Sequence, residues 1–124
     1  MNNDLLPGNF IDDGKQRWII DYEDSGNNDP CLELGNIWAE AFLDLPHLEE
    51  LVDAYYGAHR PEKYARAWLQ ALLAKYGWTL WASIQCSISE LDFDFWSWGM
   101  QKYEKAQSEF SSELFTKMLE QVTR

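Results

Sequence analysis

The chain has 124 residues, a formal net charge of −11 and two cysteines, Cys31 and Cys86. That length suits one domain, which can bury about two-thirds of its unfolded surface. The acidic charge argues against a broad basic face, so neither nucleic acid nor an anionic membrane surface is an expected partner. Solvated acidic helix faces account for such a charge, and a site that attracts a cationic substrate is the alternative. Two cysteines and no signal-peptide pattern favour free thiols and a cytoplasmic location.

The N-terminal stretch places an aspartate and an asparagine at the spacing of kinase catalytic loops. Asp4 and Asn9 form D-x-x-x-x-N, in which the carboxylate takes or orients the proton of a substrate hydroxyl and the amide oxygen holds Mg²⁺. Pro7 and Gly8 lie between them and suit a rigid loop. Phosphate-bound Mg²⁺ usually takes a further carboxylate, and Asp21 can supply it.

A β-hairpin is predicted directly after this loop. Phe10 and Ile11, a turn over residues 12–15 and the strand-like residues 17–21 carry its signals. The hairpin would fold Asp21 back beside Asn9. We therefore expect Asp4, Asn9 and Asp21 to converge within reach of one Mg²⁺ ion.

The first predicted helix follows a polar turn. Asp29 can cap its free backbone N–H groups, and Pro30 suits its first position. The helix should extend to about residue 42. Its apolar residues at helical spacing predict a buried stripe of Leu34, Ile37, Trp38, Ala41 and Phe42.

Helical periodicity continues to the C-terminus. Helices are expected over residues 46–57 and 61–89, the longer of which tolerates Gly77 at a cost of about 1 kcal/mol. The chain should be helical again from about residue 93, with a break near Ser111. The predicted fold is mainly α, in one domain made of a loop and hairpin over about residues 1–24 and a helical subdomain over about 29–124.

Two tryptophans stand three residues apart on the long predicted helix. Trp78 and Trp81 would project from neighbouring positions of one face. Aromatic faces bind quaternary ammonium groups through cation–π attraction. Ordinary core packing is the alternative, because tryptophans in a small helical domain mostly serve as core residues.

The segments NDLLPGNF, WIIDYED, DPCLEL and GWTLWASIQ together resemble choline/ethanolamine kinases and the related aminoglycoside phosphotransferases. Members of this family have a kinase-like fold and transfer the γ-phosphate of ATP to a small alcohol. The resemblance runs through most of the chain. It implies the kinase-like C-terminal lobe, with a catalytic loop and hairpin followed by a helical bundle, and it implies Mg²⁺ and ATP as cofactors.

The resemblance also implies roles for individual residues. Asp4 would be the catalytic base, and Asn9 and Asp21 the Mg²⁺ ligands. Asn2 stands where the family has histidine.

The implied substrate pocket contains Glu40, Trp78 and Trp81, with choline as the leading cationic alcohol. A solvated surface position is the alternative for Glu40. Asp24 stands where an aromatic residue is common, and its carboxylate could itself face an ammonium group.

The glycine-rich loop and strand lysine of such kinases have no counterpart in the sequence. We therefore expect a truncated or split enzyme, and little phosphate transfer by these residues alone, because positioning supplies most of the catalysis. A partner chain that supplies the other lobe, or self-association, remains open. The alternative function is a non-catalytic helical module that binds a cationic ligand or a partner protein, and a third is a remnant without activity.

Overall fold

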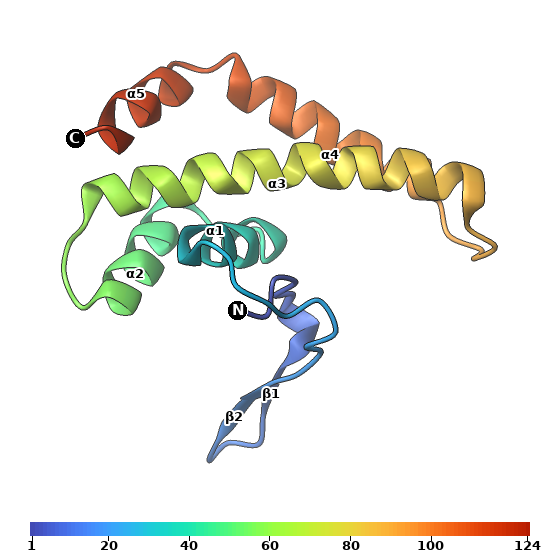
Figure 1. Cartoon of the computed structure of the whole chain (residues 1–124), viewed down its shortest axis with the longest axis horizontal. Coiled ribbons are helices and arrows are strands. Elements are labelled where there is room, and N and C mark those ends of the chain that lie inside the picture. The colour runs from blue at the N-terminus through green and yellow to red at the C-terminus, as the bar shows by residue number, and fades with distance from the viewer.

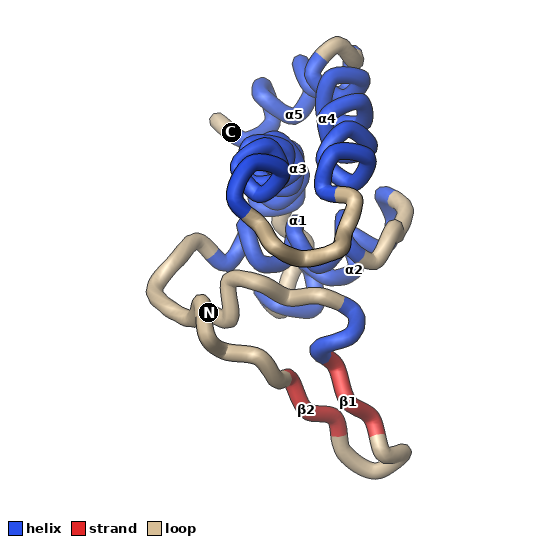
Figure 2. Tube along the Cα trace, turned by 90° about the vertical axis from the view of Figure 1, so that its right-hand side faces the viewer, coloured by secondary structure: helices blue, strands red, loops and turns tan.

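Helix α3 (Pro61–Ile88) is the longest element, and the other helices pack on two sides of it (Figure 1). The computed structural model describes all 124 residues. Helices α1 (Pro30–Glu40) and α2 (Leu45–Tyr56) lie on one side, and α4 (Phe95–Phe110) and α5 (Glu113–Val122) on the other. Figure 2, in which α3 is seen nearly end-on, shows the same two layers. The helices include none with both the length and the apolar character that a transmembrane span requires.

The predicted hairpin is present as strands β1 (Phe10–Asp12) and β2 (Arg17–Ile19). The strands are antiparallel, and Ile11 pairs with Trp18 at their centre. Gly14 in the turn has a φ of 83°, which glycine adopts without strain. Both strands are exposed, and the hairpin extends away from the helices in both views (Figures 1 and 2).

The local signals at the helix ends are confirmed. The carboxylate of Asp29 accepts a hydrogen bond of 2.9 Å from the backbone N–H of Cys31, and Pro30 is the first residue of α1. Helix α3 continues through Gly77 without a break. The chain leaves the helical conformation at Ser111 and Ser112 before α5 begins.

The predicted end of α1 and part of its buried stripe are wrong. The helix ends at Glu40, and Phe42 has a left-handed φ of 54° and a side chain that is 83% exposed. The N–H of Phe42 donates to the carbonyl of Ala39, which closes the helix end and turns Phe42 out of the stripe. Trp38 of the predicted stripe is buried, Leu34, Ile37 and Ala41 are partly exposed, and the other buried residues of α1 are Cys31, Gly35 and Asn36.

The hydrophobic core is centred on the first half of α3, where α1 and α2 pack on one side and Ala106 of α4 and Met118 of α5 on the other. Leu48 and Val52 of α2 are fully buried in one cluster with Trp68 and Leu72 of α3. Helix α1 approaches α3 most closely at Gly35, where an added Cβ would lie 2.2 Å from the carbonyl oxygen of Ala67 and 3.0 Å from the backbone nitrogen of Ala71. Backbone atoms cannot move aside as a flexible side chain can, so this crossing requires glycine.

Candidate active site

The loop that carries Asp4 is tied to the end of the hairpin by Asn2. This residue is only 4% exposed, and its Nδ2 donates to the carbonyl oxygens of Ile20 (3.2 Å) and Asp21 (2.7 Å). Its Oδ1 accepts a hydrogen bond of 3.1 Å from the N–H of Asp4. The side chain of Asn2 therefore holds the loop against the hairpin.

The hairpin brings the backbone of Asp21 beside Asn9, as the sequence pattern predicts. The N–H of Ile20 donates to the carbonyl of Asn9 at 3.0 Å, and Asp21 follows with a left-handed φ of 65°. The Nδ2 of Asn9 lies 3.4 Å from the carbonyl oxygen of Asp4. These contacts to backbone carbonyls bring the segments of Asp4, Asn9 and Asp21 together where the loop meets the hairpin, while the convergence of their side-chain oxygens stays a prediction.

The carboxyl group of Asp4 is surrounded by other carboxylates. Partial burial raises its pKa above the usual 3.8, and the negative charges of Asp24, Asp21, Glu40 and Glu23 raise it further, in that order. A cation placed among these groups would relieve the repulsion. No group of three or more His, Cys, Asp or Glu side chains has the geometry of a metal site. The two predicted Mg²⁺ ligands, Asn9 and Asp21, include only one carboxylate, so they do not form such a group.

A pocket of about 280 Å³ joins the loop to the helices. Acidic side chains come from the N-terminal segment and the end of α1, and aromatic side chains come from α3 and α4. We call it the cation pocket, and its lining residues are Asp4, Leu6, Glu23, Asp24, Glu40, Trp78, Trp81 and Trp98. It brings together all the predicted substrate residues and the predicted base, whereas Asn9 and Asp21 lie outside it.

Three tryptophans form the aromatic side of the cation pocket. The ring centroids of Trp78 and Trp81 lie 5.8 Å apart, and those of Trp98 lie 6.4 Å from Trp78 and 5.9 Å from Trp81. The three ring planes are steeply inclined to one another, at 71° to 86°. The indole N–H of Trp78 donates to Oδ1 of Asn36, which is buried in α1, at 3.3 Å. This contact fixes the orientation of the Trp78 ring relative to α1.

Glu40 is a structured wall of the pocket rather than a freely solvated residue. Its carboxylate lies 2.5 Å from the Nζ of Lys102, and each of these side chains is only 15% exposed. The same Nζ lies 4.6 Å from the centre of the Trp98 ring. Lys102 therefore holds Glu40 and Trp98 together from outside the cation pocket.

Trp98 and Glu23 are site residues that the sequence reasoning missed. Trp98 is contributed by α4, and only the packing of α4 on α3 brings it to the other two tryptophans. One signal was available: Trp98 stands one helical turn after Phe95 and one before Lys102, so an aromatic and a basic residue share its face. Glu23 neighbours the predicted Asp24, which the resemblance singled out, and both carboxylates line the pocket.

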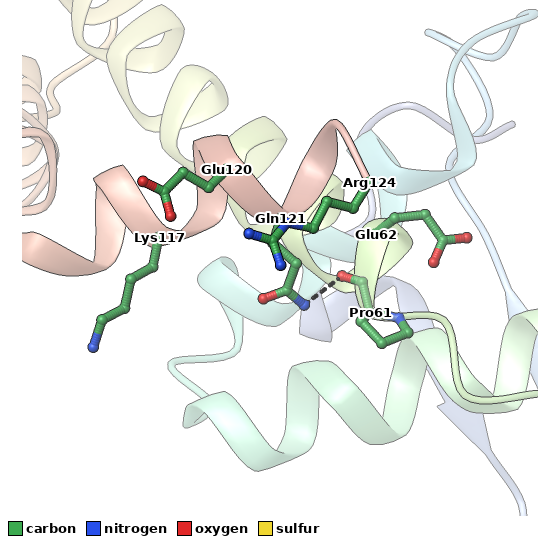
Figure 3. Close-up of a pocket in the computed structure, with 6 residues that line it drawn as sticks. All are labelled: Pro61, Glu62, Lys117, Glu120, Gln121 and Arg124. Carbon is green, nitrogen blue, oxygen red and sulfur yellow. Dashed lines mark hydrogen bonds between the residues drawn. The ribbon is translucent and has the colours of Figure 1, made fainter.

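The largest pocket of the molecule is a different, open and polar depression between the start of α3 and α5 (Figure 3). Its volume is about 660 Å³. Gln121 crosses it and donates to the carbonyl oxygen of Pro61 at 2.9 Å. Its other side chains, Glu62, Lys117, Glu120 and Arg124, mix both charges and include no aromatic ring. This depression therefore lacks the combination of acidic and aromatic side chains that lines the cation pocket.

Known proteins with a similar fold or sequence are choline and ethanolamine kinases or members of their family. The crystal structure of a choline/ethanolamine kinase family protein from Mesorhizobium loti superimposes with a TM-score of 0.91 and 31% sequence identity, over 98% of this chain and 42% of that protein. Ethanolamine kinase 2 from Rattus norvegicus is 29% identical over 84% of this chain and 32% of its own length. Probable ethanolamine kinase A from Dictyostelium discoideum is 27% identical over 84% of this chain and 36% of its own length. No protein-family model matches the chain.

The fold is that of the helical C-terminal lobe of a kinase-like protein. Over the part that it spans, the chain is similar in sequence and fold to proteins of the choline/ethanolamine kinase family. It covers about a third of the length of the ethanolamine kinases that it matches.

Proposed function

We propose that this chain forms the substrate-binding and catalytic-loop side of an ATP-dependent phosphotransferase that acts on the hydroxyl group of a small amino alcohol. The cation pocket carries the proposal, because it places the predicted base in one cavity with the acidic and aromatic groups that recognise an ammonium ion. The names of the relatives support ethanolamine or choline as the alcohol.

The two halves of the pocket suit different parts of such a substrate. The faces of Trp78, Trp81 and Trp98 attract a positive charge that cannot donate hydrogen bonds, as in a quaternary ammonium group. The carboxylates of Asp24 and Glu40 can also accept hydrogen bonds from a primary ammonium group. The pocket can therefore bind either type of amino alcohol.

Asp4 is the proposed general base. It lies in the same cavity as the ammonium-binding groups, so an alcohol held by its ammonium end would present its hydroxyl to this carboxylate. Its raised pKa makes the carboxylate a better proton acceptor than an ordinary surface aspartate. Once a substrate cation binds, its charge would favour the ionised form that a base requires.

Asn9 and Asp21 are the proposed ligands for Mg²⁺ bound to the ATP phosphates. Their oxygen-donor chemistry fits this ion, and the crowded negative charge around Asp4 favours a nearby cation. When bound, the ion would neutralise charge on the phosphates during transfer. Asn9 and Asp21 would hold the ion, and the backbone hydrogen bond from Ile20 to Asn9 keeps their two segments side by side.

The substrate part of the proposal is tested by titrating ethanolamine into the chain and into Glu40→Gln with isothermal titration calorimetry. Removing a charged partner should weaken binding about tenfold. Glu50→Gln is the matched control, because Glu50 is exposed on α2 and makes no ion pair. Equal binding by all three proteins would contradict the assignment of Glu40.

The metal part is tested separately with ATP and Mg²⁺, followed by ³¹P NMR. The wild type and Asp92→Asn, which alters an exposed loop residue, should shift the β- and γ-phosphate signals alike. Asp21→Asn should shift them much less. If the Asp21 variant behaves as the wild type does, the Mg²⁺ assignment is wrong.

A further inference from the structure

A second pocket lies on the other side of the wall formed by Glu40 and Trp98. Its volume is about 290 Å³, and three lysines line it together with the end of α1. We call it the lysine pocket, and its lining residues are Ala39, Glu40, Phe42, Lys75, Trp98, Gln101, Lys102 and Lys105. The chain has only 10 lysines and arginines in all. The positive charge here is therefore concentrated locally on an otherwise acidic molecule.

Of the three lysines that line this pocket, two form ion pairs and one does not. Lys75 is 4% exposed and places its Nζ 2.6 Å and 2.7 Å from the two carboxylate oxygens of Glu109. Lys102 is balanced by Glu40 at 2.5 Å. Lys105 makes no ion pair and is exposed at the pocket mouth, with its Nζ 5.8 Å from the ring centre of Phe42. Two of the three lysines are thus paired with carboxylates, and Lys105 has no carboxylate oxygen within 4 Å.

Phe42 supplies a second, independent observation. Its φ of 54° is a conformation that residues other than glycine adopt only at a cost, yet its side chain is 83% exposed and contributes little to the core. The left-handed turn ends α1 and directs the ring away from the core. The ring lines the lysine pocket beside Lys105, where it provides an apolar wall next to a positive charge.

We propose that the lysine pocket binds a small organic phosphate, with Lys105 and Lys102 contacting the phosphate group and Phe42 contacting the apolar part. A phosphate monoester carries up to two negative charges and several acceptor oxygens, which suits lysine donors on one helix face. Lys102 and Lys105 stand three residues apart on α4, so their side chains lie on neighbouring positions. This site does not depend on the proposed phosphotransferase function, because neither Lys105 nor Phe42 lines the cation pocket.

Calorimetric titration of phenyl phosphate and of inorganic phosphate tests this site. The wild type should bind both, and it should bind phenyl phosphate more tightly because only that probe has an apolar ring. Lys105→Gln should weaken phenyl phosphate binding about tenfold, the effect expected for one charged hydrogen bond. Lys117→Gln is the control, since Lys117 lines the polar depression of Figure 3 and should leave binding unchanged.

Phe42→Gly isolates the aromatic contribution. Glycine suits the left-handed conformation, so this variant should fold at least as well as the wild type. It should bind phenyl phosphate and inorganic phosphate with the same affinity. The proposal is overturned if the wild type binds neither probe at millimolar concentration, or if Lys105→Gln and Lys117→Gln bind phenyl phosphate equally well. It is also overturned if Phe42→Gly still prefers phenyl phosphate.

Discussion

The two halves of helix α3 carry similar apolar side chains but use them differently. In the first half, residues 61–75, the side chains of Trp68 and Leu72 are at most 2% exposed and belong to the hydrophobic core. In the second half, residues 76–88, Leu80 is 52% and Trp81 41% exposed. Here α4 packs on the helix at Gly99, where an added Cβ would lie 2.7 Å from the Cβ of Ala82.

The exposures of these residues show that apolar periodicity alone does not identify core residues. Both halves would be called buried stripes from their spacing. The first half is covered by α1, α2, α5 and the end of α4, whereas the tryptophans of the second half line the cation pocket. One helix therefore links the hydrophobic core to the proposed binding site, and substitutions in the two halves should have different consequences.

The largest expected difference concerns two leucines of α3. Leu72→Ala should lower the free energy of unfolding by about 4 kcal/mol, because Leu72 is 1% exposed and its loss leaves a cavity. Leu80→Ala should change it by less than about 0.5 kcal/mol, since Leu80 is half exposed. Urea unfolding followed by circular dichroism measures both. Equal destabilisation would show that the second half of α3 is also core.

Gly35, which packs on the first half of α3, and Gly77, which lies in its second half, should respond in opposite ways to substitution by alanine. Gly35→Ala should destabilise the fold by about 3 kcal/mol, because the new methyl group would meet the backbone of Ala67 and Ala71. Gly77→Ala should stabilise it by about 1 kcal/mol, because Gly77 lies inside α3 with no atom within 4 Å of an added Cβ. Thermal unfolding of both variants distinguishes these signs. A stable Gly35→Ala protein would contradict the close crossing of α1 and α3.

A smaller effect depends on pH and concerns the acidic side of the cation pocket. The pKa of Asp4 is raised in the folded state, so ionisation of Asp4 costs stability. Asp4→Asn should therefore be more stable than the wild type at pH 7. The difference should shrink as the pH falls through the raised folded pKa and vanish below the ordinary value of 3.8.

For Asp13 in the hairpin turn, we expect the opposite effect of ionisation on the free energy of unfolding. Backbone N–H groups of Gln16 and Lys15 lower its pKa, so its ionised form stabilises the fold above the unfolded pKa and this contribution is lost in acid. Asp13→Asn should be less stable than the wild type at pH 7. Unfolding curves across the pH range check both variants, and the same sign for the two would contradict the crowding around Asp4.

The features that the sequence predicts well are local ones. The hairpin turn around Gly14, the cap at Asp29 and the break at Ser111 depend on a few neighbouring residues, whose backbone preferences are the same in any fold. Continuation of α3 through Gly77 is also local, because one glycine costs less than a helix end.

The features that it does not predict depend on long-range packing. Phe42 leaves the buried stripe because α1 ends two residues before it, where periodicity still favours a helix. Trp98 joins Trp78 and Trp81 only because α4 folds back on α3. The support that Asn2 gives to Asp4 depends on contacts across about 20 residues of chain, to Ile20 and Asp21.

The central claim, that the tryptophans of α3 and α4 form a cation site, is tested most directly by choline affinity in paired tryptophan variants. Calorimetry should give about tenfold weaker choline binding for Trp81→Ala than for the wild type, because one aromatic face is lost. Trp96→Ala is the matched control, since Trp96 lies on α4 outside the cation pocket and is 67% exposed. Trp96→Ala should bind choline with wild-type affinity, and equal affinities for the two variants would contradict a cation site formed by these tryptophans.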